Sequence, residues 1–506
     1  MKTLSPVLFV FALAAFGAEA PKVPVPNSPY LGVVYRFADA LLEHGRDTYG
    51  PQKSGLLLSA LDRAMLAPLT NRPPAPAGIR EGDRVGAKSG PLVGANPQHD
   101  ENLLRLLYTL SELSGQRKYR DAAEAELKWF LQNTASPATH LLPWGEHLSW
   151  NVLADEPISK EDRAMHEFFR PWMLWKKCFE MAPEASRQFA LALWQHQIAD
   201  QITGAFNRHA GFWKHAAADG MDFPRHAGFY IRTWAVAYAQ TREGTFLKAI
   251  EVLLGRFESK RHPDTGLIES YSGQTSAWLA STLSLAIDCD GAAHDVTEPL
   301  ASRLRAFAAR EDSVFCGLPH DLKSRGGFVT QLEKSTAKPA GAVTPRWDAR
   351  YGGYTTAQTA LMCVARYENN GQTGYRELIT AAADSYLESL PPEEADVWPM
   401  TFGHAISLQL AAWRATARPI YLNRARQLAD RAVAAYWPEA APPASGVGPA
   451  PQNSAKPPAA LPRASLKTDH YETITGADTL ALALVELHLH ILHITAVHCP
   501  ANTIDR

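Results

Sequence analysis

Three side chains that can bind a divalent metal ion occur in one stretch, residues 139–215 of the 506-residue chain. They are His147 in the sequence WGEH, Glu167 in MHEF and His209 in FNRH, and Arg208 stands directly before the last. Two imidazoles and one carboxylate are ligands that suit Mn²⁺, and also Fe²⁺, Zn²⁺ or Ni²⁺. Because the chain contains 18 histidines, a second interpretation stays open, in which these are structural histidines held by hydrogen bonds.

The dense mix of histidine, glutamate, arginine and tryptophan in this stretch is typical of a sugar-binding, metal-assisted active site. Arginine binds carboxylates through two parallel hydrogen bonds, and aromatic faces stack on sugar rings. The sequences FPRHAGF and RWDARYGGY add such residues further along the chain. For each of them, packing in the core or exposure to solvent is the alternative. The candidate substrate contacts are Trp144, Arg225, Arg346, Arg350 and Tyr354.

The segments that must position these residues have a helical pattern. Residues 100–114 and 118–132 carry apolar side chains at positions i, i+3, i+4 and i+7, which predicts a helical hairpin. Period-2 patterns, which would predict strands, are scarce. The same helical spacing predicts helices near residues 31–50, 160–181, 184–206, 227–239, 243–257, 273–287, 296–309, 355–369, 373–389, 403–415, 418–437 and 473–495.

A dozen or more amphipathic helices in antiparallel pairs, without a parallel-strand signal, favour an all-α fold, the α/α toroid, with a few short β-hairpins in its loops. In this architecture an outer ring of helices surrounds an inner ring. A helical solenoid is the main alternative, but the chain has no repeated motif of fixed length. Because loops at one end of a toroid line a cleft, we expect WGEH, MHEF and FNRH to meet there.

The remaining features of the sequence concern the location of the protein, its domain organisation and the partners that its charge excludes. Residues 1–20 combine Lys2, an apolar run and Ala18-Glu19-Ala20, the pattern of a secretory signal peptide. Residues 21–506 are expected to form a single catalytic domain, interrupted by a Pro/Ala-rich flexible insertion at about 437–464. We therefore expect a periplasmic or secreted protein with no membrane-spanning helix. The net charge of −2 gives no basic excess of the kind that holds nucleic acid.

The series WGEH, MHEF and FNRH resembles the motifs of polysaccharide lyase family 2 over roughly residues 140–215. That family contains pectate lyases with an (α/α)₇ barrel, which cut polygalacturonate by β-elimination with a transition-metal ion, typically manganese. The resemblance implies that His147, Glu167 and His209 are the metal ligands. It also implies that Arg208 is the base that accepts the proton.

Two other functions remain open. A glycoside hydrolase on the same kind of barrel would need two carboxylates across a cleft, and the candidates are Glu146, Asp155, Asp348 and Glu472. A non-catalytic glycan-binding protein is the third possibility. His470, next to Tyr471 and Glu472, is a further candidate for the same cleft. The metal hypothesis makes one geometric demand, that the tips of the ligand side chains lie within about 6 Å of one another.

Overall fold

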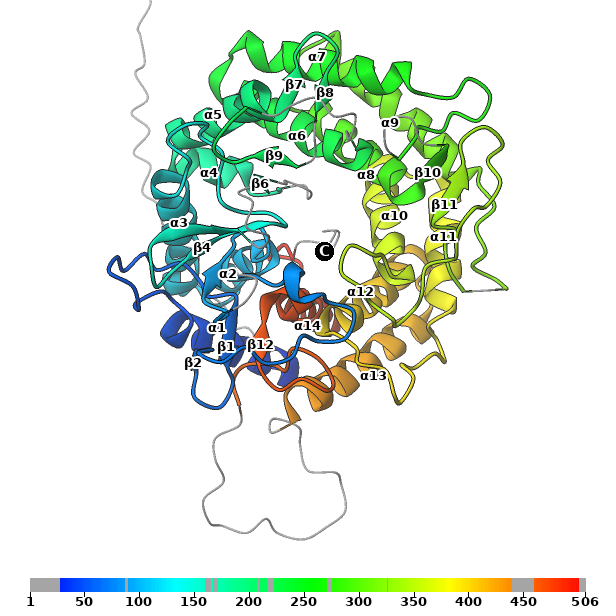
Figure 1. Cartoon of the computed structure of the whole chain (residues 1–506). Helices are drawn as coiled ribbons and strands as arrows, with labels where there is room; N and C mark the ends of the chain where they lie inside the picture. The colour runs from blue at the N-terminus through cyan, green and yellow to red at the C-terminus, as the bar shows by residue number, and fades with distance from the viewer. Residues whose placement is uncertain are drawn as a thin grey trace, which may run out of the picture.

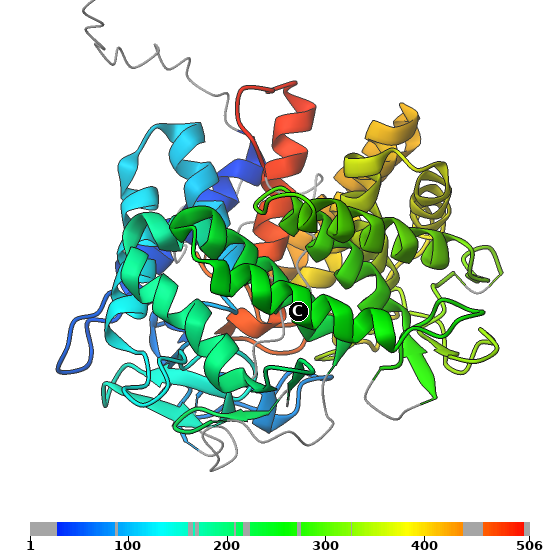
Figure 2. The ribbon, with the colours of Figure 1, turned by 90° about the horizontal axis from the view of Figure 1, so that it is seen from above.

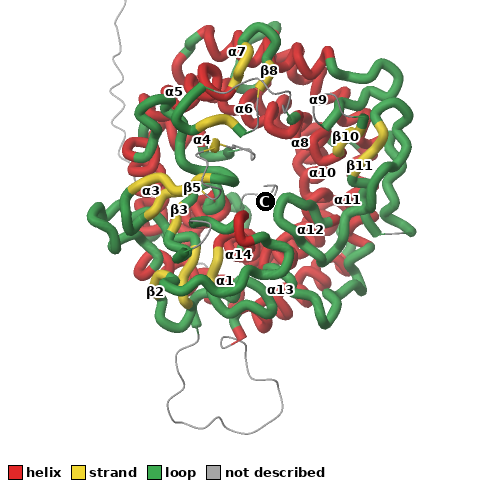
Figure 3. The backbone as a smooth tube through the Cα atoms, in the orientation of Figure 1, coloured by secondary structure: helices red, strands yellow, loops and turns green. Residues whose placement is uncertain are grey.

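The computed structural model describes residues 28–86, 90–159, 165–166, 172–206, 209–215, 223–270, 275–324, 326–438 and 459–499. Helices dominate this part of the chain, and its strands are only two to four residues long (Figure 3). The sequence-based expectation of an all-α fold with short β-hairpins in the loops is therefore confirmed. The described residues contain fourteen α-helices: α1 Pro29–His44, α2 Glu101–Ser114, α3 Arg117–Asn133, α4 Trp175–Met181, α5 Pro183–Ala192, α6 Pro224–Thr241, α7 Gly244–Ser259, α8 Leu279–Ala293, α9 Leu300–Cys316, α10 Thr356–Asn370, α11 Thr373–Asp384, α12 Pro399–Thr416, α13 Pro419–Tyr436 and α14 Ala477–Ile491.

The helices form a closed ring, seen along its axis in Figure 1. Along the inner side, α6 contacts α8, α8 contacts α10, α10 contacts α12, and α12 contacts α14. The ring closes because α14 also contacts α1 and α2, from the other end of the chain. The short α4 contacts α3, α5 and α6 and completes the circle. This closure confirms the α/α toroid and excludes the open solenoid.

Burial separates the inner helices from the outer ones. In α12 and α14 nearly every residue is buried, because neighbours cover these helices on all sides. In α3, an outer helix, burial falls on one face only, at Tyr119, Ala123, Glu126 and Phe130 among others. An apolar stripe of this kind is what a helix with one solvent-facing side requires. The two rings together enclose one continuous hydrophobic core that extends from Tyr30 to Leu489.

The inner helices lie parallel and close together. A Cβ atom on Gly403 of α12 would lie 2.9 Å from the backbone nitrogen of Leu480 in α14. One end of α2 meets the same end of α14, where the Leu103 nitrogen donates to Asp478 and the Asn102 amide donates to Thr479. The amino ends of these three inner helices therefore lie at the same end of the ring.

Connections from an inner helix to an outer helix differ in length and content from those that lead back from an outer helix to an inner one. The links from an inner helix to the next outer helix are short: residues 115–116, 242–243, 371–372 and 417–418 join four of the pairs. The segments from an outer helix back to the next inner helix are long, and they carry all the described strands. These are β1 Ala60–Asp62, β2 Ala67–Pro68, β3 Gly94–Ala95, β4 Leu148–Asn151, β5 Glu156–Ser159, β6 Met165–His166, β7 Ile198–Asp200, β8 Ala205–Phe206, β9 Ala210–Gly211, β10 Ser276–Trp278, β11 Gln331–Glu333 and β12 Tyr471–Glu472.

Figure 2 shows that the α2–α3 and α12–α13 links lie on one side of the ring and most of the strands on the other. The strands pair antiparallel in small sheets, with the orders β12-β1-β2 and β3-β4-β5 and the pairs β6-β9, β7-β8 and β10-β11. They therefore build a layer over the amino ends of the inner helices.

Several predicted helices were wrong over part of their length. The helix predicted at 273–287 begins only at Leu279, after β10, and the one predicted at 31–50 ends at His44. The helix predicted at 184–206 ends at Ala192, where a short π-turn leads into β7 and β8. The turn between these strands is set by the Asp200 carboxylate, which accepts from the Ile202 and Thr203 nitrogens, and by Gly204 at φ +71°. In the segment predicted as helix 160–181, helix begins only at Trp175, after β6. Residues 160–164 and 167–171 lie outside the described part.

The described ends of the Pro/Ala-rich insertion lie next to each other. The Trp437 indole donates to the Ala460 carbonyl at 3.0 Å, and the Arg463 nitrogen donates to the Tyr436 carbonyl at 3.0 Å. The chain therefore leaves and re-enters the fold at one place. All five cysteines are free thiols. Within the described ranges, no helix combines the length and the apolar character that a membrane crossing demands. The predicted signal peptide lies outside these ranges.

Candidate active site

His147 and His209 lie against each other, although 61 residues separate them in the sequence. Their ring centres are 5.2 Å apart, and the ring planes are inclined at 77°. Two imidazoles that bind one ion through bonds of about 2.1 Å have ring centres roughly 4.5–5.2 Å apart for bond angles between about 90° and 109°. The observed separation lies within the range for one shared ion, and it is also the separation of an ordinary edge-on contact between two rings. Of the three predicted ligands, the two imidazoles are together in the described structure.

A turn held by one buried amide presents His147. The Asn96 side chain donates to the carbonyl oxygens of Gly145 at 2.7 Å and Leu148 at 3.2 Å, and it accepts from the Gly145 nitrogen at 3.3 Å. Gly145 has a φ of +92°, which a residue with a side chain rarely adopts. β4 starts at the residue after His147 and lies between β3 and β5 in a three-stranded sheet. The backbone on both sides of His147, a residue that is 8% exposed, is therefore held in place.

His209 is placed by the pairing of β6 with β9. In this ladder His166 is opposite Ala210 and Met165 is opposite Gly211. In the sequence, Glu167 comes directly after His166, and His209 comes directly before Ala210. The predicted ligand Glu167 and the predicted base Arg208 both lie outside the described residues. Within the described residues, no group of three or more histidine, cysteine, aspartate or glutamate side chains is arranged to hold a metal ion.

Glu146, the neighbour of His147 in the chain, connects the WGEH turn to charged and aromatic side chains from two other segments. The side chain of Glu146, next to His147, is 15% exposed, and its carboxylate lies 3.9 Å from the Arg80 guanidinium. The pKa of Arg80 is raised, chiefly by its hydrogen bonds to Asp83 and to a smaller degree by Glu146. Tyr351 stacks on His99, with ring centres 6.3 Å apart. These contacts bring segments before α2, α4 and α10 to one place.

Arg225 and Tyr354, both predicted substrate contacts, contact each other. The Arg225 guanidinium donates to the Tyr354 hydroxyl at 3.2 Å and lies over the Phe223 ring, 5.3 Å from its centre. Arg225 is 8% exposed and is the second residue of α6, where the helix dipole favours anions. The pair therefore offers a fixed cation and a hydroxyl at the start of an inner helix, which suits a carboxylate ligand.

Three other predicted contacts are placed differently. Trp144 is 1% exposed and packs against the rings of Phe130, Trp172, Trp175 and Phe189. It is a core residue, and the prediction that it stacks on a sugar was wrong. The sequence could not distinguish the two roles, because a tryptophan in an aromatic-rich stretch serves either purpose.

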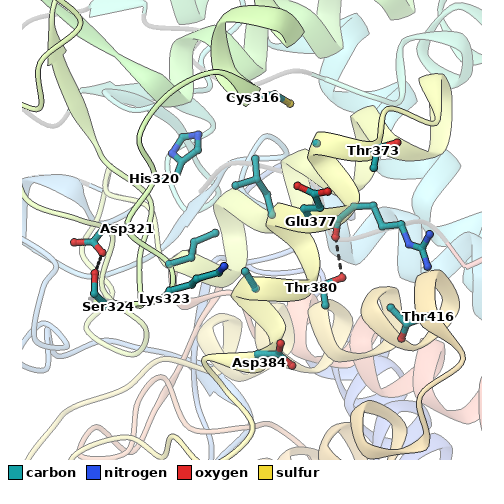
Figure 4. Close-up of a pocket in the computed structure, with 15 residues that line it drawn as sticks. Cys316, His320, Asp321, Lys323, Ser324, Thr373, Glu377, Thr380, Asp384 and Thr416 are labelled. Carbon is teal, nitrogen blue, oxygen red and sulfur yellow. Dashed lines mark hydrogen bonds between the residues drawn. The ribbon is translucent and has the colours of Figure 1, made fainter.

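Arg346 and Arg350 lie apart from Arg225. Arg350 is exposed and pairs with Asp348 at 3.2 Å. Arg346 lines a hollow of about 440 Å³ together with Lys323 and Asp384 of α11. This hollow adjoins a larger one of about 870 Å³, which lies between α11 and the segment after α9. Figure 4 shows that Asp321, Lys323, Glu377 and Asp384 surround it. Neither histidine of the pair lines either hollow, so Arg346 belongs to a different surface.

Two histidines that the sequence offered as further site residues are structural. His226 is fully buried between the rings of Phe223 and Phe229. His470 is 3% exposed and bonds to the Glu472 carboxylate at 2.8 Å. Both imidazoles are therefore out of reach of a substrate.

One of the four carboxylates that a glycoside hydrolase could use, Glu472, is buried and bonded within the protein. Glu472 is 1% exposed and accepts from Arg84 at 2.9 and 2.8 Å. Burial alone would raise the pKa of Glu472, but hydrogen bonds from His470 and Arg84 hold the pKa below its ordinary value. Asp155 lies at the turn between β4 and β5, where it accepts from the Gln52 nitrogen, and Asp348 is exposed. Of the four candidate carboxylates, Glu146 is the one beside the histidine pair.

Sequence reasoning missed Arg80, Asp83 and His99 as neighbours of the site. They come from residues 68–98, which are rich in Pro and Gly, and from the residue that follows them before the start of α2, a region in which no site residue was predicted. The cluster Arg80-Glu81-Gly82-Asp83-Arg84 is the signal that could have drawn attention to them, since dense charge in a long loop is typical of binding segments.

The fold is an α/α toroid whose long connections hold a pair of histidines in ring contact. Residues 88–272 match the family model described as periplasmic pectate lyase. The family resemblance predicted from the sequence is thereby confirmed for this part of the chain, which contains both histidines and Arg225. The motif assignments themselves are not tested by the match.

A pectate disaccharide-lyase of Dickeya dadantii is 26% identical over 172 residues. This stretch is 33% of the present chain and 31% of the relative, so the similarity spans about a third of that protein's length. Among solved structures, a D-mannose isomerase shares 8% identity with a TM-score of 0.47 and covers 91% of this chain and 97% of its own. An unsaturated glucuronyl hydrolase specific for heparin shares 12% identity with a TM-score of 0.45, covering 93% and 99%. These structural scores carry no argument about chemistry.

Proposed function

We propose that the protein is a metal-dependent lyase that cleaves an acidic polysaccharide, polygalacturonate, by β-elimination. The observation that carries the proposal is the pair His147–His209, whose 5.2 Å separation suits one shared ion. The match of residues 88–272 to the periplasmic pectate lyase family supports it. That description also supports a periplasmic location for this chain.

The residues that would hold the ion are His147 and His209, with Glu167 as the third ligand by resemblance, and Mn²⁺ suits this donor set. When bound, the ion would act as a Lewis acid toward the uronate carboxylate and stabilise negative charge on it. Around it, Asn96 keeps His147 oriented through the turn at Gly145.

The elimination itself moves one proton and breaks one bond. A base takes the proton from C5 of the uronate, the C–H electrons form the C4=C5 double bond, and the C4–O bond breaks with its electrons leaving on oxygen. By resemblance, Arg208 is this base. Because arginine is protonated in neutral water, this role requires a site that favours its neutral form. Arg225, which donates a hydrogen bond to Tyr354, would bind a uronate carboxylate.

The test is an absorbance assay with polygalacturonate. A lyase releases an unsaturated product that absorbs in the ultraviolet, whereas a hydrolase releases reducing ends without this absorbance. We expect absorbing product with Mn²⁺, none after chelation, and recovery when Mn²⁺ is restored. Reducing ends that persist in chelator without ultraviolet absorbance would favour the hydrolase instead.

Variants of the predicted metal ligands and of the predicted base test their roles. His147→Ala and His209→Ala should each lower Mn²⁺ affinity and turnover by at least roughly 100-fold. Arg208→Lys should keep Mn²⁺ affinity and lose turnover. His294→Ala is the control, because this exposed histidine follows α8 and lies in a short link. Unchanged Mn²⁺ affinity in both histidine variants would refute the metal site.

A further inference from the structure

A small cavity lies beside Arg225, between the start of α8 and the segment that precedes α10. Its volume is about 260 Å³. Buried Leu279, Phe328 and Val329 line its interior, and the half-buried rings of Trp278 and Tyr354 line it nearer the surface. Figure 1 shows the corresponding elements, β10 and β11, beside α8 and α10. The exposed Gly352 and Gly353 also line the cavity, so it is open to solvent on that side.

The cavity and the arginine site share a wall that is one aromatic ring thick. Tyr354 lines the cavity with its ring and accepts from Arg225 with its hydroxyl, at 3.2 Å. On the other side, the Trp278 ring meets the Phe223 ring edge-on, with centres 5.2 Å apart, and Arg225 lies over that same Phe223 ring. A polymer bound at Arg225 would therefore have its neighbouring unit within reach of the cavity.

The lining of the cavity differs in charge from the rest of the site. Among the described residues that line it there is no aspartate, glutamate, lysine, arginine or histidine. The polar groups are the side chains of Thr330, Gln331, Thr344 and Thr359. A carboxylate that enters such a lining loses its water without gaining a cation, which is unfavourable. An uncharged sugar can stack on the aromatic rings and bond to the Gln331 amide. The Thr330 and Thr359 hydroxyls already donate to the Ala342 and Thr355 carbonyl oxygens, so they can accept hydrogen bonds from the sugar hydroxyls.

The size points to a single unit. Pockets that hold drug-sized molecules measure roughly 300–1000 Å³, and this cavity is slightly smaller. It suits one sugar ring with its substituents and excludes a longer segment of chain.

We propose that this cavity is a subsite for one uncharged sugar unit, next to a uronate whose carboxylate is bound by Arg225. Two sources share this chemistry: a uronate whose carboxyl group is methyl-esterified, and a neutral sugar that alternates with uronates. The inference rests on the proposed action on an acidic polysaccharide. It adds that the polymer is mixed in charge, with charged and uncharged units side by side.

Three polymers distinguish the outcomes: fully de-esterified polygalacturonate, partly methyl-esterified polygalacturonate, and a polymer in which uronates alternate with neutral sugars. Binding is measured by calorimetry in chelator, where no turnover occurs, and turnover is measured separately with Mn²⁺. We expect at least one mixed polymer to bind about 5-fold or more tightly than the de-esterified one, and which of the two does so identifies the source.

The variant Gln331→Lys places a cation in the cavity from a half-buried position on β11. It should remove the preference for the mixed polymer, weakening that binding by about 5- to 100-fold, and should leave de-esterified polygalacturonate bound as well or better. Gln116→Lys makes the same charge change at an exposed position in the α2–α3 link and should change neither.

Equal binding of all three polymers by the unaltered protein, or equal loss in Gln331→Lys for all of them, would overturn the subsite. Absence of absorbing product from every polymer would instead contradict the lyase function, whatever the binding preference. The two failures are therefore distinguishable.

Discussion

The two kinds of connection in the ring differ in length and in the residues that they contain. Links from inner to outer helices are short, and in four of them the helix ends in a left-handed residue: Gly115, Arg242, Gly371 and Ala417, with φ between +57° and +66°. Segments from outer to inner helices are long, and they hold the histidine pair, Tyr354 and all described strands. The helices are continuous beside both kinds of connection, and most of the candidate site residues lie in the long segments, with Arg225 in the first turn of α6.

Helix α6 offers the sharpest test of this division, because an arginine stands at each end. Arg225, at its start, bonds to Tyr354, and Arg242 is its left-handed cap. Arg225→Ala should lower kcat/KM on polygalacturonate by about 10- to 100-fold, since a hydrogen bond to a charged group is worth about 1.5–3 kcal/mol. Arg242→Ala should leave kcat/KM unchanged. Steady-state kinetics, with thermal melting to confirm folding, would measure both. Equal losses would show that the links also contribute to function.

The sequence predicted the helices well because their signal is local. The apolar spacing of residues 118–132 and the continuous apolar run in α14 depend on nearby residues alone. Prediction failed where structure depends on a distant partner. β6 exists because it pairs with β9, more than forty residues later, and no local pattern at residues 165–166 announces that pairing.

The same distinction explains the site predictions. The nearness of His147 and His209 followed from family resemblance, because nothing in their spacing requires contact. Trp144 was misassigned because residue type does not reveal which side of a loop faces the core. Glu472 was a plausible acid by type, but its partner Arg84 lies 388 positions away, and this pairing is invisible in the sequence. Local patterns therefore define the scaffold, and long-range contacts decide which of the candidate groups are available.

Two glycines with the same backbone conformation, one in each kind of connection, allow the stability cost of an added side chain to be compared. Gly476, before α14, has φ +70°, and a Cβ there would lie 2.5 Å from the Met400 Cβ. Gly371, in the α10–α11 link, has φ +66° with nothing within 4 Å of such an atom. Gly371→Ala should cost about 1 kcal/mol of unfolding free energy, from the left-handed backbone alone. Gly476→Ala should cost about 2–4 kcal/mol, because overpacking adds to the strain.

Denaturant unfolding of both variants measures this difference. Gly90→Ala is a further reference, with φ +146° and open space around the added atom. If Gly476→Ala and Gly371→Ala lose the same stability, the close packing of the segment before α14 against α12 contributes nothing, and the two kinds of connection are equally tolerant.

The smallest effect is expected at the two links that place a side chain where glycine is preferred. Arg242 and Ala417 have φ +64° and +57°, a conformation that costs a residue with a Cβ roughly 1 kcal/mol relative to glycine. Arg242→Gly and Ala417→Gly remove this strain but give the unfolded chain more freedom, which offsets part of the gain. Each should therefore raise the unfolding free energy by only about 0.5 kcal/mol. Because the sites lie at the ends of different helices, the double variant should show the sum.

A loss of stability in either variant would mean that the side chain itself stabilises the link. Arg242 has such a contact, because its guanidinium lies over the Tyr238 ring, 5.5 Å from the ring centre. Ala417, whose methyl group can make no such contact, separates the two explanations: if Ala417→Gly is stabilising and Arg242→Gly is not, backbone strain is common to both links and the cation–π contact offsets it in one.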